Sequence, residues 1–181
     1  NSYLFALLSS GEITLFNLST KTSEAIKLDQ PVIQIAWMNK KQSIVTLFWD
    51  LTVGLVDLEH VQVFGTRNPF ESQIDSHILV AHPNFDMAAI CDDKLRLIDF
   101  RDSPKILETE LKQHATAVSW LPNDNFGCAL GFANGDLDFF SFKSNETVMH
   151  QNITKDSIYG IEFCPANPSA VSLIVENNIL F

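Results

Sequence analysis

The sequence is short of positive charge, and it has no long hydrophobic run. Its 181 residues include 12 Lys and Arg against 22 Asp and Glu, which gives a formal net charge of −10. A chain with this excess of negative charge is not expected to have the positively charged surface that binds phosphates, so nucleic acid is not expected as a direct partner. No apolar stretch approaches the roughly 20 residues that a membrane helix needs, so membrane insertion is not expected either.

Cysteine is also scarce. Cys91, Cys128 and Cys164 are three in number and form no C-x-x-C pair, which argues against a disulfide framework and favours reduced core thiols. We therefore expect an intracellular protein, nuclear or cytoplasmic. The alternative is a secreted or lumenal glycosylated protein, because N-x-S/T triplets begin at Asn17, Asn145 and Asn152.

Motifs that carry catalysis are missing. The five histidines are scattered with no metal-ligand spacing, the nucleophile motif G-x-S-x-G is absent, and no Gly-rich turn is followed by Lys-Ser/Thr. We therefore expect no enzyme activity, no catalytic residues, no metal site and no cofactor.

Hydrophobic residues, by contrast, make up 46% of the chain and include 14 Phe, which is enough for a packed core. They recur with a period. Segments made of a polar turn and an alternating strand begin near Ser10, Asp50, Asp92, Asn134 and Glu176. Their first apolar strand residues succeed one another in steps of 40, 42, 42 and 42 residues: Ile13, Val53, Leu95, Leu137 and Ile179. A regular step of this length indicates a structural repeat.

Each repeat contains further strand-like segments. An apolar segment precedes each later turn, and these segments end at Met38, Pro83, Pro122 and Pro165. Another apolar run lies between the segment and the turn, and a more polar strand follows the turn. Apolarity falls from the second strand to the fourth, as expected for a four-stranded antiparallel blade whose outermost strand is exposed. The sequence therefore predicts an all-β protein.

The period and strand pattern resemble the WD-repeat β-propeller family, whose blades run about 40 to 45 residues with early G-H and late W-D signatures. The W-D position holds Phe16-Asn17, Val56-Asp57, Ile98-Asp99 and Phe140-Ser141 here, so Trp is lost throughout and Asp is kept twice. His114 occupies a G-H position. The resemblance implies structural roles for His114, Asp57 and Asp99.

The resemblance also implies an incomplete ring. About four to four and a half blades are visible, whereas six or seven blades are common in this family. We expect one incomplete propeller domain over residues 1–181, whose other blades are supplied by missing residues or by a partner chain. The approximate repeat units are 1–30, 31–73, 74–113, 114–154 and 155–181.

Acidic residues give this propeller a candidate binding surface. On a WD-like propeller, the turns between second and third strands and the links between fourth and first strands share one rim. That rim would hold Asp29, Asp50, Asp75, Asp92, Asp93 and Asp156. A negative rim would steer a basic peptide or a basic partner surface, although Asp also suits turns for local reasons.

Two other features are candidates for binding. The link from Phe64 to Ser76 is long and irregular, and it is either a docking loop presenting Arg67 and Phe70 or a tolerated insertion. Trp37, Trp49 and Trp120 are expected in the core, with a ligand-stacking role for Trp49 as the alternative.

The sequence thus predicts a non-catalytic interaction scaffold, a WD-repeat-like subunit of a larger complex whose partners are other protein subunits, some with basic surfaces. A reader of basic or modified peptides is the alternative within the same fold.

Overall fold

All regular structure in the described part of the chain is β-strand. The computed structural model describes residues 3–50, 52–57, 61–62, 77–91, 94–101, 105–123, 126–164, 166–176 and 178–180. Eighteen strands and no helix lie in these ranges, which confirms the all-β prediction. In the same ranges, no helix has the length and apolarity to cross a membrane.

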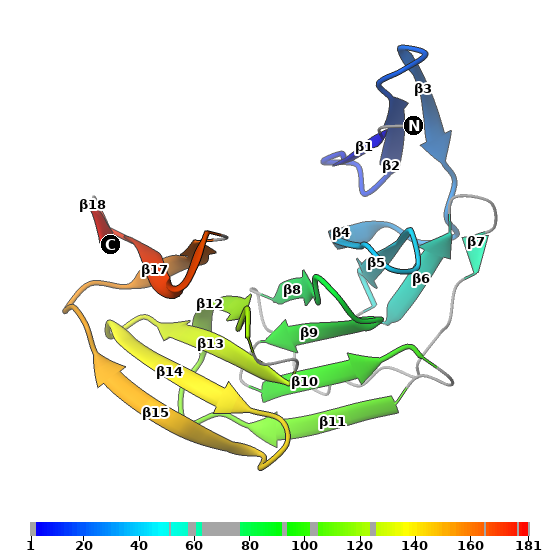
Figure 1. Cartoon of the computed structure of the whole chain (residues 1–181). Coiled ribbons are helices and arrows are strands. Elements are labelled where there is room, and N and C mark those ends of the chain that lie inside the picture. Colours follow the sequence, from blue (N-terminus) through cyan, green and yellow to red (C-terminus); the bar gives the residue numbers. More distant parts are fainter. Residues whose placement is uncertain are drawn as a thin grey trace. The chain divides into compact units, whose positions relative to one another are not determined.

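The chain divides into two compact units, residues 1–73 and 74–181. The first unit holds a three-stranded sheet in the order β1-β2-β3 and a four-stranded sheet in the order β4-β5-β6-β7 (Figure 1). The strands are β1 Tyr3–Leu7, β2 Ile13–Asn17, β3 Thr22–Ile26, β4 Val32–Met38, β5 Ser43–Phe48, β6 Val53–Asp57 and β7 Val61–Gln62.

The second unit holds three sheets, with strand orders β11-β10-β9-β8, β12-β13-β14-β15 and β16-β17-β18. Figure 1 shows them following one another in chain order. The strands are β8 Ile78–Ala81, β9 Met87–Cys91, β10 Lys94–Asp99, β11 Lys105–Glu110, β12 Ala115–Trp120, β13 Gly127–Phe132, β14 Asp136–Ser141, β15 Glu146–Asn152, β16 Ile158–Cys164, β17 Asn167–Val175 and β18 Asn178–Leu180.

Each sheet is an antiparallel meander in which consecutive strands pair. Burial follows the predicted gradient: every residue of the second strands β5, β9 and β13 is buried, whereas all seven residues of the fourth strand β15 are exposed. A strand paired on both edges and covered on both faces must be apolar throughout, while the outermost strand contacts water.

The residues that define the sequence period fall on equivalent strands. Ile13, Val53, Leu95 and Leu137 lie at the start of β2, β6, β10 and β14, and all four are buried. Ile179 lies in the equivalent strand β18 but is 57% exposed, because it faces away from the packed side of its sheet. The first sheet lacks an innermost strand and the last lacks an outermost one among the described residues.

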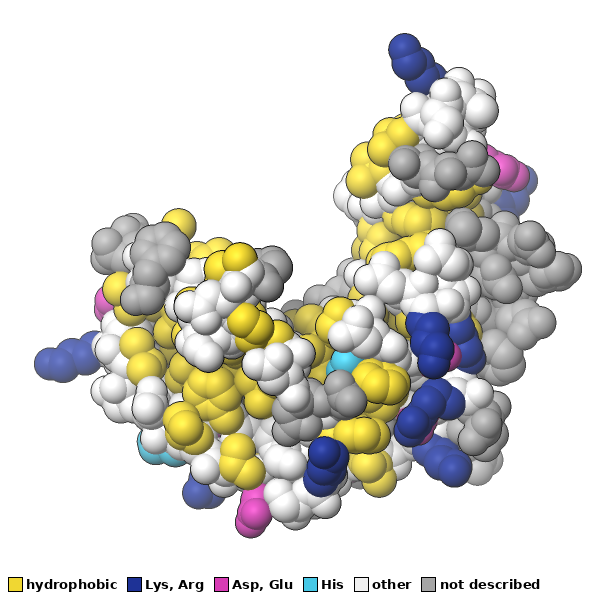
Figure 2. Space-filling model, in the orientation of Figure 1, with side chains coloured by type: hydrophobic (Ala, Val, Ile, Leu, Met, Phe, Trp, Pro, Cys, Tyr) yellow, Lys and Arg dark blue, Asp and Glu magenta, His cyan; other side chains and the backbone are white. Residues whose placement is uncertain are grey.

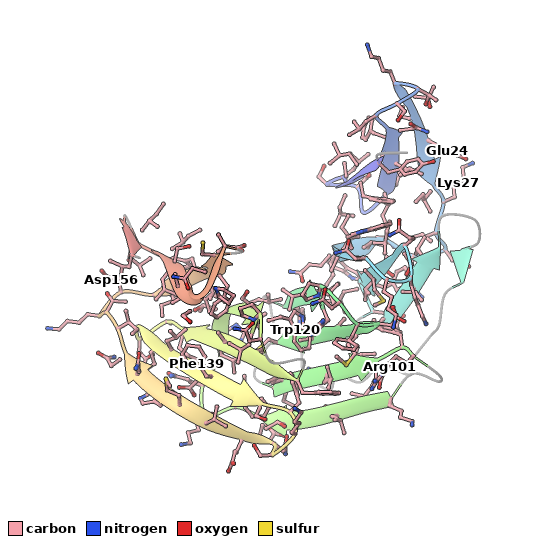
Figure 3. The ribbon with its side chains drawn as sticks, in the orientation of Figure 1. Glu24, Lys27, Arg101, Trp120, Phe139 and Asp156 are labelled. Carbon is pink, nitrogen blue, oxygen red and sulfur yellow. The ribbon has the colours of Figure 1, made fainter. Side chains whose placement is uncertain are left out.

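Neighbouring sheets in the second unit pack face to face through their apolar side chains. One core joins the β8–β11 and β12–β15 sheets, and a second joins the β12–β15 and β16–β18 sheets. Hydrogen bonds also join the sheets: the Trp120 Nε1–H donates to the Val80 carbonyl at 3.3 Å, and the Thr116 hydroxyl donates to the Ile158 carbonyl at 2.6 Å. Figure 3 labels Trp120.

The cysteines are free thiols. Cys91 and Cys128 are buried in the core as predicted, and burial raises the pKa of the Cys128 thiol well above its ordinary value. Cys164 is exposed, so the prediction of a core position is wrong for this residue. It ends β16, where a register shift after Phe163 takes it off the packed face.

Candidate protein-binding surfaces

Turns and links come together at one end of the sheets in each unit. In the first unit, the Val32 N–H donates to the Gly11 carbonyl at 2.9 Å, so the β1–β2 turn lies against the β3–β4 link. In the second unit, the Ile153 N–H donates to the Gly135 carbonyl at 3.1 Å, so the β13–β14 turn lies against the β15–β16 link. Both glycines have positive φ, +83° and +79°. In each unit, we call these second-to-third turns and fourth-to-first links the rim.

Three of the six predicted rim carboxylates lie in described and exposed positions. Asp29 is on the β3–β4 link, Asp50 is in the β5–β6 turn and Asp156 is on the β15–β16 link, where Figure 3 labels it. Asp75, Asp92 and Asp93 lie outside the described residues, as do Arg67 and Phe70 of the predicted docking loop. A partner-binding role for all of these residues stays a prediction.

The Asp50 carboxylate is fixed by its own turn. Its Oδ1 accepts hydrogen bonds from the Thr52 backbone N–H at 3.0 Å and from the Thr52 hydroxyl at 2.7 Å. Partial removal from water raises the pKa of Asp50, but the bonds from Thr52 and from the Gln30 side chain outweigh this and lower it overall. The rim therefore holds an oriented negative charge that persists in mild acid.

Trp49 lies beside this carboxylate and is 76% exposed, so the prediction of a core position is wrong. Strand β5 ends at Phe48, and Trp49 is the first residue of the turn that follows. Its backbone N–H donates to the Pro31 carbonyl at 3.0 Å, which ties the turn to the β3–β4 link and leaves the indole in solvent. The other two tryptophans pack inward: Trp120 is 6% exposed, and Trp37 is half-buried and stacks on Phe5.

Of the three residues expected to have structural roles, the structure describes the side chains of two. His114 is half-buried just before β12. Asp99 ends β10 and accepts hydrogen bonds from the Arg101 backbone N–H at 3.0 Å and from its guanidinium at 2.6 Å. The side chain of Asp57, at the end of β6, is not described. The structural roles of these residues stay predictions.

A polar groove of about 460 Å³ is a second candidate surface, and the sequence pattern did not reveal it. It lies between β11 and the β14–β15 hairpin, over the rings of Phe132 and Phe140. One wall holds Asp136, Asp138 and His150. Both signs of charge line it, since Glu110 and Glu146 occur with Lys112.

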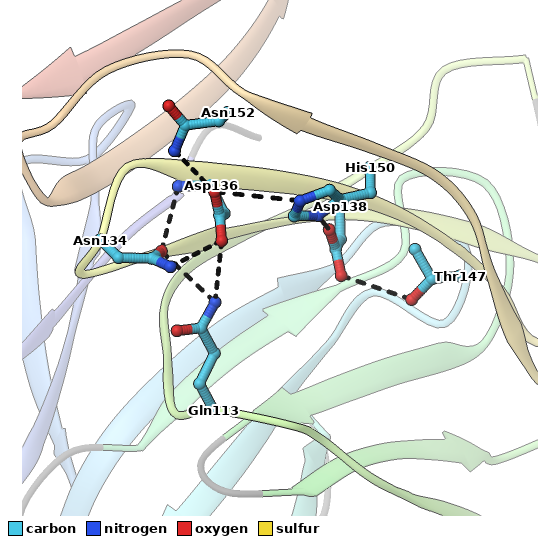
Figure 4. A network of polar contacts seen from close by, with 7 residues as sticks. All are labelled: Gln113, Asn134, Asp136, Asp138, Thr147, His150 and Asn152. Atoms are coloured by element: carbon cyan, nitrogen blue, oxygen red, sulfur yellow. Dashed lines mark hydrogen bonds and ion pairs between the residues drawn. The ribbon is translucent and has the colours of Figure 1, made fainter.

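A hydrogen-bond network orders this wall (Figure 4). Asp136 accepts bonds from the amides of Asn152 at 2.7 Å, Asn134 at 2.6 Å and Gln113 at 3.4 Å. The bond from Asn152 is the main reason that the pKa of Asp136 is lowered. Asp138 contacts His150 Nδ1 at 2.6 Å, and this contact raises the pKa of His150.

The network depends on cross-strand register. Asp136 and Asp138 are two residues apart on β14 and share a face, and the register sets Asn152 opposite Asp136 and His150 opposite Asp138. The alternation of Asp136 and Asp138 is visible in the sequence. The pairing is not, because a register shift between Phe139 and Phe140 sets which β15 residues face them.

The His150 pair gives a pH prediction. The pKa of His150 is raised in the fold, so protonated His150 stabilises the folded state at pH values below its unfolded pKa of about 6.5. This contribution is lost as the pH rises through the folded pKa. We expect Asp138→Asn to return the His150 pKa toward 6.5, measured by NMR titration of the imidazole. Thr147→Val is the matched control, since it removes only a 3.4 Å bond to the same carboxylate. An unchanged His150 pKa in Asp138→Asn would contradict the assignment.

Among the residues that the structure describes, no three His, Cys, Asp or Glu side chains gather in a set that could hold a metal ion.

Comparison with known proteins identifies the fold. No family model and no curated protein matches the sequence. The β-propeller domain of Cps50 (Swd1) from Myceliophteria thermophila matches with a TM-score of 0.77 and 14% identity, over 96% of this chain and 59% of that one. A chain in the crystal structure of a mitotic checkpoint complex matches with a TM-score of 0.76 and 11% identity, over 95% of this chain and 53% of that one. This chain thus spans little more than half the length of either match.

Proposed function

We propose that this chain, which has the β-propeller fold of WD-repeat type, is an interaction scaffold within a multi-protein complex, and that the rim around Trp49 binds a basic segment of a partner. The fold supports the general part of the proposal, since matching propellers include one from a protein complex. Fold alone names no partner, so the finer part rests on the rim.

The exposure of Trp49 is the observation that carries the proposal. An indole that is 76% exposed leaves a large apolar surface in water, and the backbone bond from Trp49 to Pro31 holds its turn in place. Trp is enriched among the residues that dominate binding free energy at protein interfaces. An exposed Trp on a turn that a backbone hydrogen bond holds in place therefore suits a contact with another protein.

The charges beside Trp49 favour a basic partner. Asp50 follows it directly and is ionised at neutral pH, and the Gln30 side chain that hydrogen-bonds Asp50 comes from the same link as the exposed Asp29. A Lys or Arg side chain could lie over the indole face while its charge meets the Asp50 carboxylate. The net charge of −10 would speed the approach of a basic surface and repel polyanions.

The test compares partner recovery by wild type and Trp49→Ala. Affinity purification of the tagged protein from its native cells, with quantitative mass spectrometry, identifies partners, and titration of each purified partner gives its affinity. We expect Trp49→Ala to weaken at least one partner about 30-fold, as for a residue worth about 2 kcal/mol. Asp50→Asn should weaken the same partner and reduce the salt dependence of its binding.

Leu107→Ala is the matched control, since Leu107 is 54% exposed on β11, away from the rim. Equal recovery and affinity of every partner in wild type and Trp49→Ala would contradict partner binding by the rim. Loss of binding without any change in salt dependence in Asp50→Asn would remove the basic segment from the proposal.

We propose further that these blades belong to a larger ring, of six or seven blades. The last sheet supports this, because Tyr159, Ile174 and Ile179 leave an apolar face that is 48–58% exposed at these residues. A further blade packed on that face would bury it, as the β12–β15 sheet buries the opposite face. The greater length of both matching chains also supports additional blades.

A further inference from the structure

The polar groove between β11 and the β14–β15 hairpin is bridged near both ends of β14. At one end, the Thr109 hydroxyl donates to the side-chain carbonyl of Asn145. At the other end, the Gln113 amide donates to Asn134 at 3.3 Å and to Asp136 at 3.4 Å. Both bridges run from β11, or from the link after it, to the next sheet of the second unit. The groove is therefore formed before any ligand arrives, which lowers the cost of binding.

The groove has an apolar floor and charged walls. Leu111 and the rings of Phe132 and Phe140 line the floor, and the two rings are only 2–3% exposed. Among the described residues, the walls hold four carboxylates and one lysine, from Glu110, Asp136, Asp138, Glu146 and Lys112. Figure 2 shows side chains of both charges over the ends of β11 and β15, at the lower edge of the second unit. An apolar floor below an excess of negative charge suits a cation on an apolar stem.

Two of these carboxylates have capacity left for a hydrogen-bond donor (Figure 4). Asp138 Oδ1 contacts His150 Nδ1 at 2.6 Å, but within the described residues Asp138 Oδ2 accepts only a 3.4 Å bond, from the Thr147 hydroxyl. The Asp138 side chain is 18% exposed, so water reaches it poorly. Glu146 makes no hydrogen bond or ion pair within the same residues. A carboxylate can accept about four hydrogen bonds, so both acids can take a further donor.

We propose that this groove binds one arginine side chain of a partner protein. The stem packs over the two buried rings, and the guanidinium donates to Asp138 Oδ2 and to Glu146. Arginine suits the groove better than lysine, because its planar fork of donors can reach carboxylates on both β14 and β15. Glu110 takes no part, since Lys94 already pairs with it at 3.0 Å. The groove lies in the second unit, whereas Trp49 of the proposed rim belongs to the first.

The test titrates the 181-residue chain with the blocked tripeptide Gly-Arg-Gly and follows the His150 imidazole signal by NMR. We expect this signal to shift and to saturate, because the guanidinium binds the carboxylate that His150 contacts. A tripeptide with citrulline keeps the shape of arginine but not its charge, and it should bind about 10-fold more weakly or worse. A tripeptide with lysine keeps the charge but not the fork, and it should bind about 2- to 10-fold more weakly.

Two variants locate the site. Asp138→Asn should weaken binding of the arginine tripeptide about 10-fold, and Glu146→Gln should weaken it less, because Glu146 is exposed. Glu162→Gln is the matched control, since it removes the same charge from an exposed position on β16, outside the groove. It should bind as wild type, and so should Trp49→Ala, which lies in the other unit.

Equal affinity for the arginine and citrulline tripeptides, or no saturable shift at His150, would overturn a cation site in the groove. Wild-type affinity in both Asp138→Asn and Glu146→Gln would overturn the assigned carboxylates. Equal affinity for the lysine tripeptide would overturn arginine as the occupant. Weakening by Glu162→Gln as large as that by Asp138→Asn would attribute binding to net charge alone. None of these results bears on the Trp49 rim, so the two proposals fail separately.

Discussion

Replacing Gly135 by alanine is expected to lower the free energy of unfolding of the second unit by about 2–4 kcal/mol. Gly135 has a φ of +79°, where a Cβ costs about 1 kcal/mol or more. A Cβ at this position would also lie 2.1 Å from the Thr154 carbonyl oxygen, so the β15–β16 link would have to move. Urea unfolding followed by circular dichroism gives the change in free energy.

Gly160→Ala is the matched control within the same unit. Gly160 has no positive φ, and a Cβ there meets first the Cδ1 atom of Ile174 at 3.0 Å, at the end of a flexible side chain. We expect a change within about 1 kcal/mol. A free energy of unfolding for Gly135→Ala within about 0.5 kcal/mol of the wild-type value would contradict the close packing of the β13–β14 turn against the β15–β16 link.

The fold was largely predictable because one physical constraint repeats along the chain. A blade strand covered on both faces must be apolar, and a tight turn before the third strand favours polar residues or Gly, so the pattern returns about every 42 residues at Ile13, Val53, Leu95 and Leu137. Burial of β5, β9 and β13 and exposure of β15 follow from the same constraint. The period did not depend on the WD signature residues, most of which are absent.

The binding surfaces were less predictable, because they depend on single-residue boundaries. Whether Trp49 is buried or exposed depends on whether β5 ends at Phe48 or one residue later. An apolar residue at the end of a strand does not indicate where the strand ends. The sequence pattern therefore predicts a buried indole, whereas the Trp49–Pro31 backbone bond holds the turn that presents it to solvent. The exposed Trp is the feature on which the proposed function rests.

Burial of the charged Arg96 side chain was not predictable for a related reason. Arg96 is 2% exposed in the middle of β10, where the alternation alone gives no reason for a charged side chain. Its Nε–H donates to Glu108 on β11 at 2.8 Å, since the register sets these residues opposite each other. The bond from Lys94 lowers the pKa of Glu108 most, with Arg96 contributing, so this acid stays ionised beside the guanidinium. A pair of this kind becomes visible only when the register is known.

Trp120→Ala is expected to have the largest effect of the substitutions considered, about 3–5 kcal/mol on the unfolding of the second unit. The indole is 6% exposed and packs against His82 at 4.6 Å and Phe142 at 5.8 Å between ring centroids. Removing it leaves a cavity between two sheets and leaves the Val80 carbonyl without this donor.

Trp120→Phe separates the packing of this indole from its hydrogen bond. Most of the ring remains, so the loss should be clearly smaller than for alanine, with the missing Val80 bond contributing about 0.5–1.5 kcal/mol. Leu107→Ala is the control within the same unit and should change the free energy by no more than about 0.5 kcal/mol, because that side chain is 54% exposed on β11. Equal destabilisation by Trp120→Ala and Leu107→Ala in urea would contradict the burial of Trp120 between two sheets.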